Sequence, residues 1–156
     1  MNAQFAVAAK NAVKNASRTV HLLLVSLLPA VALAAGPFLF TPQGARYQDL
    51  VVGTGDSARS GDVVAVHFIG WLDDNGAKGK EIYNTRRAGK VVSFVLGTDR
   101  VMPGWNEGVT GMREGGKRLV MLPPALAFGD RRVDDIIPPH ASLIFVIDLV
   151  RLEQQQ

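Results

Sequence analysis

One short segment, residues 101–109, most constrains the fold of this chain. Pro103 suits the first position of a helix, where its missing N–H costs nothing, and Glu107 lies near enough to that N-terminus to interact favourably with the macrodipole. Trp105, Val109 and Met112 fall at i, i+4 and i+7, which predicts an apolar face. A helix this short is unstable alone in water, so its apolar face must pack on a larger element. The rest of the chain must therefore supply a sheet.

The N-terminal region has the pattern of a targeting segment. Residues 1–48 contain no Asp or Glu, three basic residues precede the apolar run at 20–33, and Ala32-Leu33-Ala34 fits a small-residue cleavage site. This pattern predicts a signal peptide over residues 1–34 that engages the membrane during export and is cleaved after Ala34, leaving a protein in a bacterial periplasm. The run is shorter than the ~20 residues of a spanning helix. An uncleaved membrane anchor is the alternative, and an organelle transit peptide is disfavoured.

Removal of this leader changes the charge balance. The chain has 17 basic and 14 acidic residues, and three of the basic ones lie in the leader, so the mature chain is formally neutral. The sequence therefore gives no basic patch that would predict nucleic-acid binding. Because the chain contains no cysteine, a packed apolar core must stabilise it in an oxidising compartment without disulfides.

The mature chain is dominated by strand patterns. Residues 35–46 form a short lead-in without periodicity, and 153–156 a polar tail. Strands are predicted at residues 47–52, 63–72, 80–85, 91–96, 117–122 and 142–152. The charges that begin the strand at 117–122 are expected to point outward, and Gly115-Gly116 is expected to end the preceding helix. With no helix long enough for parallel crossovers, an α+β fold with an antiparallel sheet wrapped on the helix is predicted.

Conventional catalytic groups are nearly absent from the predicted mature chain. Asp73-Asp74-Asn75-Gly76 is better explained by a hairpin turn than by paired carboxylate chemistry, because neighbouring side chains on a strand diverge. His67 is interpreted as a satisfied core histidine within a strand, and His140 as a turn residue after two prolines. No spacing indicates a zinc or calcium site, so neither a metal nor another cofactor is expected, and hydrolase chemistry is a weak hypothesis.

Apolar and aromatic residues instead gather near the strand ends and in the long irregular stretch that ends at His140. A long loop in a compact domain is usually functional, and apolar residues bordered there by glycine and proline favour a ligand pocket. The residues concerned are Val101, Met102, Trp105, Phe128, Ile136, Ile137 and Phe145.

Five motifs occur in a recognisable order. They are Val66-His67-Phe68-Ile69-Gly70, Phe94-Val95-Leu96-Gly97, Val101-Met102-Pro103-Gly104-Trp105-Asn106-Glu107-Gly108, Ala127-Phe128-Gly129 and Ile136-Ile137-Pro138-Pro139-His140-Ala141-Ser142-Leu143-Ile144-Phe145. Together they closely resemble FKBP-type peptidyl-prolyl cis-trans isomerases over residues 47–152. The resemblance implies a strongly bent, five- to six-stranded antiparallel sheet around one short helix. It also implies an enzyme that accelerates rotation about X–Pro bonds in folding proteins.

The resemblance also implies a set of site residues. Trp105 would form the floor of a proline pocket, and the backbone N–H of Met102 would bond a substrate carbonyl. The implied catalytic residues are Trp105, Phe145, Phe128, Phe68 and Met102, and the implied substrate-binding residues are Val101, Ile82, Tyr83, Val92, Ile136 and Ile137. Several differ from the family's commonest residues: Phe68 and Phe128 replace Tyr, Ile82 and Val92 replace Phe, and Tyr83 replaces Asp.

These differences shape the expected partners. The apolar exchanges keep the pocket walls hydrophobic, whereas the missing hydroxyls and carboxylate remove polar contacts with substrate or macrolide ligands. The expected ligands are proline-containing polypeptides and, with reduced affinity, macrolide inhibitors, and a monomer is the default expectation. The alternative is a non-catalytic or weakly catalytic proline-peptide-binding or chaperone module of the same fold. An inert β domain ranks below both.

Overall fold

The structure, a computed structural model, describes residues 35–155. The predicted signal peptide at residues 1–34 and its cleavage site lie outside the described residues and stay a prediction. Seven strands, one α-helix and one 3-10 turn follow one another along the described chain. Their bounds are β1 Leu39–Phe40, β2 Arg46–Val51, β3 Val63–Asp74, β4 Ala77–Asn84, β5 Val92–Val95, α2 Pro103–Val109, β6 Lys117–Leu122, the 3-10 turn Pro124–Leu126, and β7 Leu143–Glu153.

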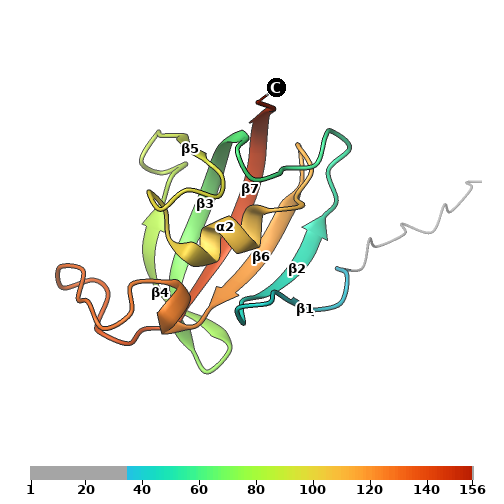
Figure 1. The fold of residues 1–156 in the computed structure, drawn as a ribbon. Coiled ribbons are helices and arrows are strands. Elements are labelled where there is room, and N and C mark those ends of the chain that lie inside the picture. The colour runs from blue at the N-terminus through green and yellow to red at the C-terminus, as the bar shows by residue number, and fades with distance from the viewer. Residues whose placement is uncertain (1–34, 156) are drawn as a thin grey trace, which may run out of the picture. The chain divides into compact units, whose positions relative to one another are not determined.

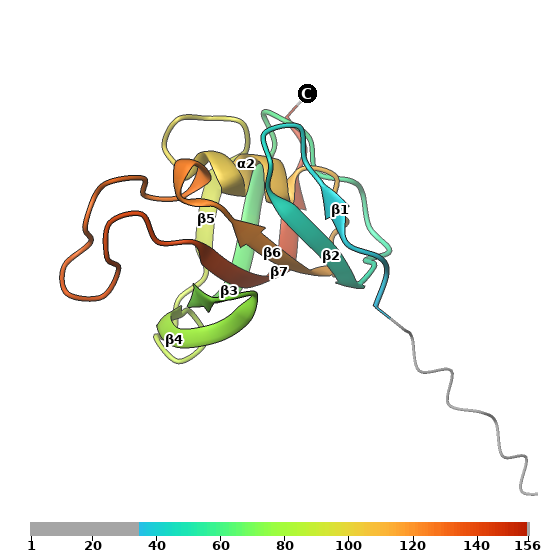
Figure 2. The ribbon, with the colours of Figure 1, turned by 90° about the horizontal axis from the view of Figure 1, so that it is seen from below.

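All the strands belong to one open antiparallel sheet. The order is β1-β2-β6-β7-β3-β4, and β5 pairs with the first half of β3 on the edge that β4 occupies along the second half. Helix α2 lies across one face of this sheet, and the strands curve around it (Figure 1). The view from below shows the sheet bending between the β1–β2 side and the β3–β4 side (Figure 2). The predicted α+β class, a bent antiparallel sheet on one short helix, is confirmed.

The sheet has one strand more than the upper end of the predicted range. The lead-in folds back as β1, with Leu39 paired to Tyr47 and Phe40 to Arg46. A turn closed by the Thr41 N–H donating to the carbonyl of Ala45 at 2.8 Å makes this pairing possible. A strand of two residues is too short to show alternation, which is why the sequence pattern did not reveal it.

The hairpin between β3 and β4 confirms the turn predicted at residues 73–76. Asn75 and Gly76 have φ values of 52° and 88°, the left-handed conformation that a two-residue hairpin loop requires. The Asp73 carboxylate accepts the Gly76 N–H at 2.6 Å. The acidic pair therefore belongs to the turn, and the tight loop extends both strands beyond the predicted bounds.

Helix α2 is shorter than predicted. Pro103 does occupy its first turn, as expected, but the helix ends at Val109 rather than at Gly115-Gly116, because Thr110 leaves the helical conformation with a ψ of 132°. The first turn holds no acidic residue, so the expected interaction of Glu107 with the helix N-terminus is wrong. The Glu107 carboxylate instead accepts a hydrogen bond from the Thr41 hydroxyl, which ties the helix to the β1–β2 turn.

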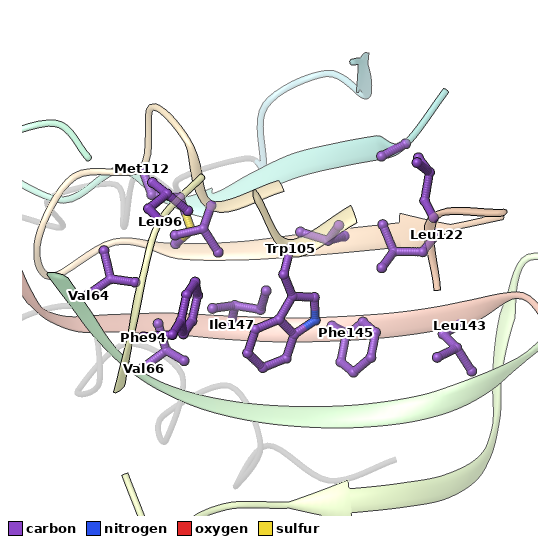
Figure 3. Packing of buried hydrophobic residues seen from close by; sticks show 14 of the residues in the cluster. Val64, Val66, Phe94, Leu96, Trp105, Met112, Leu122, Leu143, Phe145 and Ile147 are labelled. Atoms are coloured by element: carbon purple, nitrogen blue, oxygen red, sulfur yellow. The ribbon is translucent and has the colours of Figure 1, made fainter. Parts of the chain in front are cut away.

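The hydrophobic core fills the space between α2 and the concave face of the sheet. Trp105 lies at its centre and Phe94 and Phe145 flank the indole, as Figure 3 shows. Met112 is 2% exposed although it follows the end of the helix, so the predicted apolar face does pack against the sheet. Within residues 35–155 no helix is both long enough and apolar enough to span a membrane.

Candidate active site

Trp105 is held edge-on by aromatic rings from the sheet. Its ring centroid lies 4.6 Å from that of Phe68, at 84°, and 5.5 Å from that of Phe145, at 89°. Phe94 packs at 5.5 Å on a third side. Edge-to-face contacts of this kind are favourable because the positive rim of one ring meets the negative face of another. Trp105 is 5% exposed and thus forms a fixed surface at the base of a cavity.

Two glycines allow α2 to approach the sheet this closely. A Cβ atom on Gly108 would lie 2.8 Å from Cγ1 of Val120, and one on Gly104 would lie 2.8 Å from the carbonyl oxygen of Leu126. Both separations are too short for real atoms. Gly104 and Gly108 therefore set the depth at which the indole of Trp105 sits in the core.

The C-terminal end of α2 is anchored by a buried arginine. Arg118 is 5% exposed, and its Nη1 donates to the carbonyls of Gly108 at 2.9 Å and Thr110 at 3.1 Å. Its Nε and Nη2 donate to the two carboxylate oxygens of Asp49 at 2.7 and 3.2 Å, and the guanidinium lies 4.3 Å from the ring of Tyr47. A cation is favourable at a helix C-terminus, and this fork also satisfies two carbonyls that the helix leaves open.

This arginine corrects one prediction. The charges that begin β6 were expected to point outward, and Lys117 fits that expectation, with its Nζ 3.3 Å from Asp148 on a half-exposed surface. Arg118 instead faces the core. Alternation along the strand contained this signal, because Arg118, Val120 and Leu122 share one face.

The cavity above Trp105 has a volume of about 450 Å³. Its wall is built by strands β3, β4, β5 and β7, the approach to α2, and the long loop between β6 and β7. The lining residues are Phe68, Ile82, Tyr83, Val92, Val101, Met102, Trp105, Phe128, Val133, Ile136, Ile137 and Phe145. All eleven residues predicted for the site thus lie around one cavity. Val133 is the lining residue that sequence reasoning missed.

Val133 belongs to the cavity because the long loop folds back on itself. Its N–H donates to the carbonyl of Ile137 at 3.0 Å, and the Ile137 N–H donates to the Val133 carbonyl at 3.1 Å. At the base of the loop, His140 has a φ of 58° and donates its N–H to the carbonyl of Gly129 at 2.8 Å. The predicted turn role of His140 is confirmed, and these bonds present Phe128 to the cavity.

Phe68 is positioned by a hydroxyl that the sequence did not single out. Thr85 is completely buried; its Oγ1 accepts the Phe68 N–H at 2.9 Å and donates to the Phe68 carbonyl at 3.2 Å. The same oxygen lies 3.0 Å from Nδ1 of His67, which confirms that this strand histidine is hydrogen-bonded, although it is half-buried rather than in the core. The ring of Phe68 stacks on the half-exposed ring of Tyr83 at 5.5 Å and 28°.

Gly70 makes room for two wall residues. A Cβ atom there would lie 2.8 Å from Cε1 of Phe145 and 3.2 Å from Cγ1 of Ile82. Phe145 can therefore lie across β3 toward the cavity only because position 70 has no side chain.

The polar groups of the cavity are few. Among the lining residues, the Tyr83 phenol is the only titratable side chain, and Tyr83 is 43% exposed. The backbone N–H of Met102 donates no hydrogen bond within residues 35–155 and remains available at the cavity. The Trp105 Nε1 is buried without a hydrogen-bond acceptor among the described residues. In Figure 3 it lies on the side of the indole that faces Phe145.

The described residues also contain no cluster of three or more side chains that could hold a metal ion. The geometry consequently defines an apolar site with room for a compact hydrophobic group and a free backbone N–H, with no nucleophile or acid–base pair in its lining.

Comparison with known proteins agrees with this class of site. Residues 55–150 match the family of FKBP-type peptidyl-prolyl cis-trans isomerases. A protein of Neisseria meningitidis serogroup A named FK506-binding protein is 39% identical over 105 residues, which cover 67% of this chain and 93% of that protein. FK506-binding protein 2 of Yarrowia lipolytica is 35% identical over 137 residues, covering 84% of this chain and 92% of that protein.

Solved structures give the same result. The crystal structure of FkpA from Escherichia coli superposes with a TM-score of 0.66 at 35% identity, covering 74% of this chain and 51% of that chain. This chain therefore spans about half the length of FkpA. The protein belongs to the FKBP-type family and is a peptidyl-prolyl cis-trans isomerase.

Proposed function

We propose that the protein is an exported isomerase that accelerates X–Pro rotation in folding polypeptides by binding the twisted amide in the cavity above Trp105. The observation that carries this mechanism is the lining itself, which surrounds the cavity with aromatic and aliphatic side chains. A mechanism that rests on shape and solvent exclusion requires such a wall and does not require a nucleophile.

The chemistry follows from the electronic structure of the amide. The X–Pro bond resists rotation by about 18–20 kcal/mol because resonance gives the C–N bond partial double-bond character. The planar form is more charge-separated than the twisted form, so removing water from the carbonyl disfavours the planar form relative to the twisted one. Each 1.36 kcal/mol by which binding lowers the barrier raises the rate about tenfold.

Individual residues have distinct tasks in this mechanism. The proline ring packs on the Trp105 indole, with Phe68 and Phe145 at its sides. The free Met102 N–H donates to a substrate carbonyl next to the rotating bond. Pro103 does not compromise that donor, since it follows Met102 and lacks only its own N–H. The loop that carries Phe128 and Ile137 covers the flanking peptide.

The same cavity is proposed to accept macrolide ligands, since relatives are named for FK506 binding. Affinity is expected to be reduced, because Phe128 and Phe68 carry no hydroxyl and Tyr83 stacks on Phe68 where the family usually places a carboxylate. A macrolide bound there would compete with proline peptides for the Trp105 surface.

A refolding-limited or protease-coupled isomerisation assay tests the mechanism. The protein purified from an exporting host should accelerate the cis-to-trans reaction of a Leu-Pro peptide, and Trp105→Ala should abolish most of this acceleration. A Trp105→Ala protein as active as the wild type would exclude the proposed role of the cavity floor.

Export is proposed from the leader pattern. We expect the mature protein to begin at Ala35, in the periplasm of a bacterial host. Cell fractionation and the intact mass of the purified protein test this, and a full-length mass in the membrane fraction would instead identify the leader as an anchor.

A further inference from the structure

A second cleft, of about 370 Å³, adjoins the proline pocket on its β4 side. Its lining comprises the end of β4 and the turn that follows: Glu81, Ile82, Tyr83, Asn84, Arg87 and Ala88. Ile82 and Tyr83 line both cavities. The two cavities therefore adjoin along β4, and a residue that flanks a proline bound in the first lies near the second.

The second cleft differs from the first in its charge. Arg87 Nη1 donates to Glu81 Oε1 at 2.6 Å, and the two side chains are 73% and 31% exposed. A guanidinium has five N–H donors, and Glu81 accepts one of them, so several face solvent. Residues 85–90 contain three basic side chains and no acidic one. One of them, Arg86, is paired at 3.0 Å with Asp148, which lies on β7 beyond β3.

The turn that carries Arg87 is fixed by hydrogen bonds. The Arg87 N–H donates to Asn84 Oδ1 at 3.0 Å, and the Ala88 N–H to the Asn84 carbonyl at 3.0 Å. The Lys90 N–H closes the turn on the Thr85 carbonyl at 2.9 Å. Because the backbone of the turn is held, only the Arg87 side chain remains to be ordered when a ligand binds.

We propose that this cleft is a subsite for an acidic side chain that flanks the proline of the substrate. The inference rests on the proposed function, since it places the proline in the adjoining pocket. A carboxylate there forms charge-assisted hydrogen bonds with the free N–H groups of Arg87, while Tyr83 packs on the intervening backbone. Glu81 competes for the same guanidinium and thereby limits the strength of the contact.

The test uses Leu-Pro peptides that carry Glu, Gln or Lys at one position, which is either the second residue before the proline or the first or second residue after it. The measured quantity is the ratio of kcat/KM for the Glu peptide to that for the Lys peptide. At one or more positions the wild type should prefer Glu by about threefold, the size expected of an exposed ion pair, and added salt should reduce this preference.

Two substitutions should move this ratio in opposite directions. Glu81→Gln removes the competing carboxylate and should raise the preference for Glu, whereas Arg87→Gln leaves Glu81 alone and should reverse the preference toward Lys. Arg59→Gln removes the same charge from an exposed position outside the cleft and should leave the ratio unchanged.

An identical ratio for the wild type and both cleft variants at every position would overturn the subsite while leaving the isomerase intact. If no peptide is isomerised, the proposed function itself fails. The subsite is then judged by the same Glu-to-Lys ratio in peptide affinity, measured by tryptophan fluorescence. An affinity ratio that does not respond to Arg87→Gln would overturn it.

Discussion

The part of helix α2 that carries Trp105 and the C-terminal end of the helix are held by opposite kinds of contact. Toward the pocket, Trp105 meets only aromatic and aliphatic side chains, and its indole N–H lacks an acceptor among the described residues. At the other end of the helix, Arg118 makes four hydrogen bonds and an ion pair with Asp49, although it is as buried as Trp105. Polar contacts thus hold the helix in place, and the pocket is kept free of them.

This difference separates two tasks. A mechanism based on desolvating an amide gains from a low-polarity wall, whereas a seven-residue helix cannot hold its own position. Arg118 and the β1–β2 turn, through Thr41 and Glu107, supply the positioning from outside the pocket. The comparison therefore predicts that stability and activity respond to different substitutions.

The largest effect is expected for Arg118→Met. The change leaves the Asp49 carboxylate and the two helix carbonyls without their donor, which should lower the free energy of unfolding by about 3 kcal/mol. Urea denaturation measures it, and the double variant with Asp49→Asn should recover part of the loss. Arg118→Lys keeps the charge but not the forked set of N–H donors, so its free energy of unfolding should lie between those of the wild type and Arg118→Met. A loss below about 1 kcal/mol would show that the anchor is dispensable.

Trp105→Leu should affect activity in particular. Without the indole, kcat/KM should fall about 100-fold, equivalent to about 2.7 kcal/mol of transition-state stabilisation. Phe94→Leu is the matched control, because Phe94 packs against Trp105 but does not line the pocket. It should lose stability but retain kcat/KM within about threefold under conditions in which circular dichroism shows the protein folded. Equal losses of kcat/KM in Trp105→Leu and Phe94→Leu would show that Trp105 acts as an ordinary core residue rather than as the floor of the pocket.

Gly70→Ala should displace a residue of the pocket wall, Phe145, without contacting Trp105 at the floor. The added methyl group would overlap Phe145, and such overpacking typically costs about 1–3 kcal/mol. Because Phe145 must move, KM should rise more than kcat falls. Gly36→Ala adds the same group where the nearest atom is 3.9 Å away and should change neither constant. A Gly70→Ala enzyme with wild-type KM would show that Phe145 tolerates displacement.

The smallest effect is expected for Phe128→Tyr, which returns a hydroxyl to the pocket. One added hydrogen bond to a ligand carbonyl is worth about 0.5–1.5 kcal/mol, so the dissociation constant of a proline peptide or macrolide should fall about threefold. Calorimetry measures this. Weaker binding would mean that ligand affinity depends more on a wholly apolar wall than on an added hydrogen bond. Phe38→Tyr, in the exposed lead-in, controls for a general effect of the hydroxyl.

Most of the site could be predicted because its residues lie in contiguous motifs. Segments such as Pro103-Gly104-Trp105 and Ile136-Ile137-Pro138-Pro139 carry the resemblance to the family, from which the eleven site residues were predicted, and all eleven line one cavity. Val133 escaped because it joins the wall through a hydrogen-bonded fold of the loop that no local pattern encodes.

The sequence by itself determined the apolar periodicity and the turn at Asn75-Gly76, since these follow from local sterics and side-chain chemistry. It indicated the pocket residues through the motifs that resemble the family. Only the tertiary structure decided which groups satisfy the buried Arg118, that β1 adds to the sheet, and that α2 ends at Val109. The first of these depends on a group distant in the chain. Asp49 lies 69 residues from Arg118, and the energy of their contact exists only once the sheet brings β2 and β6 together.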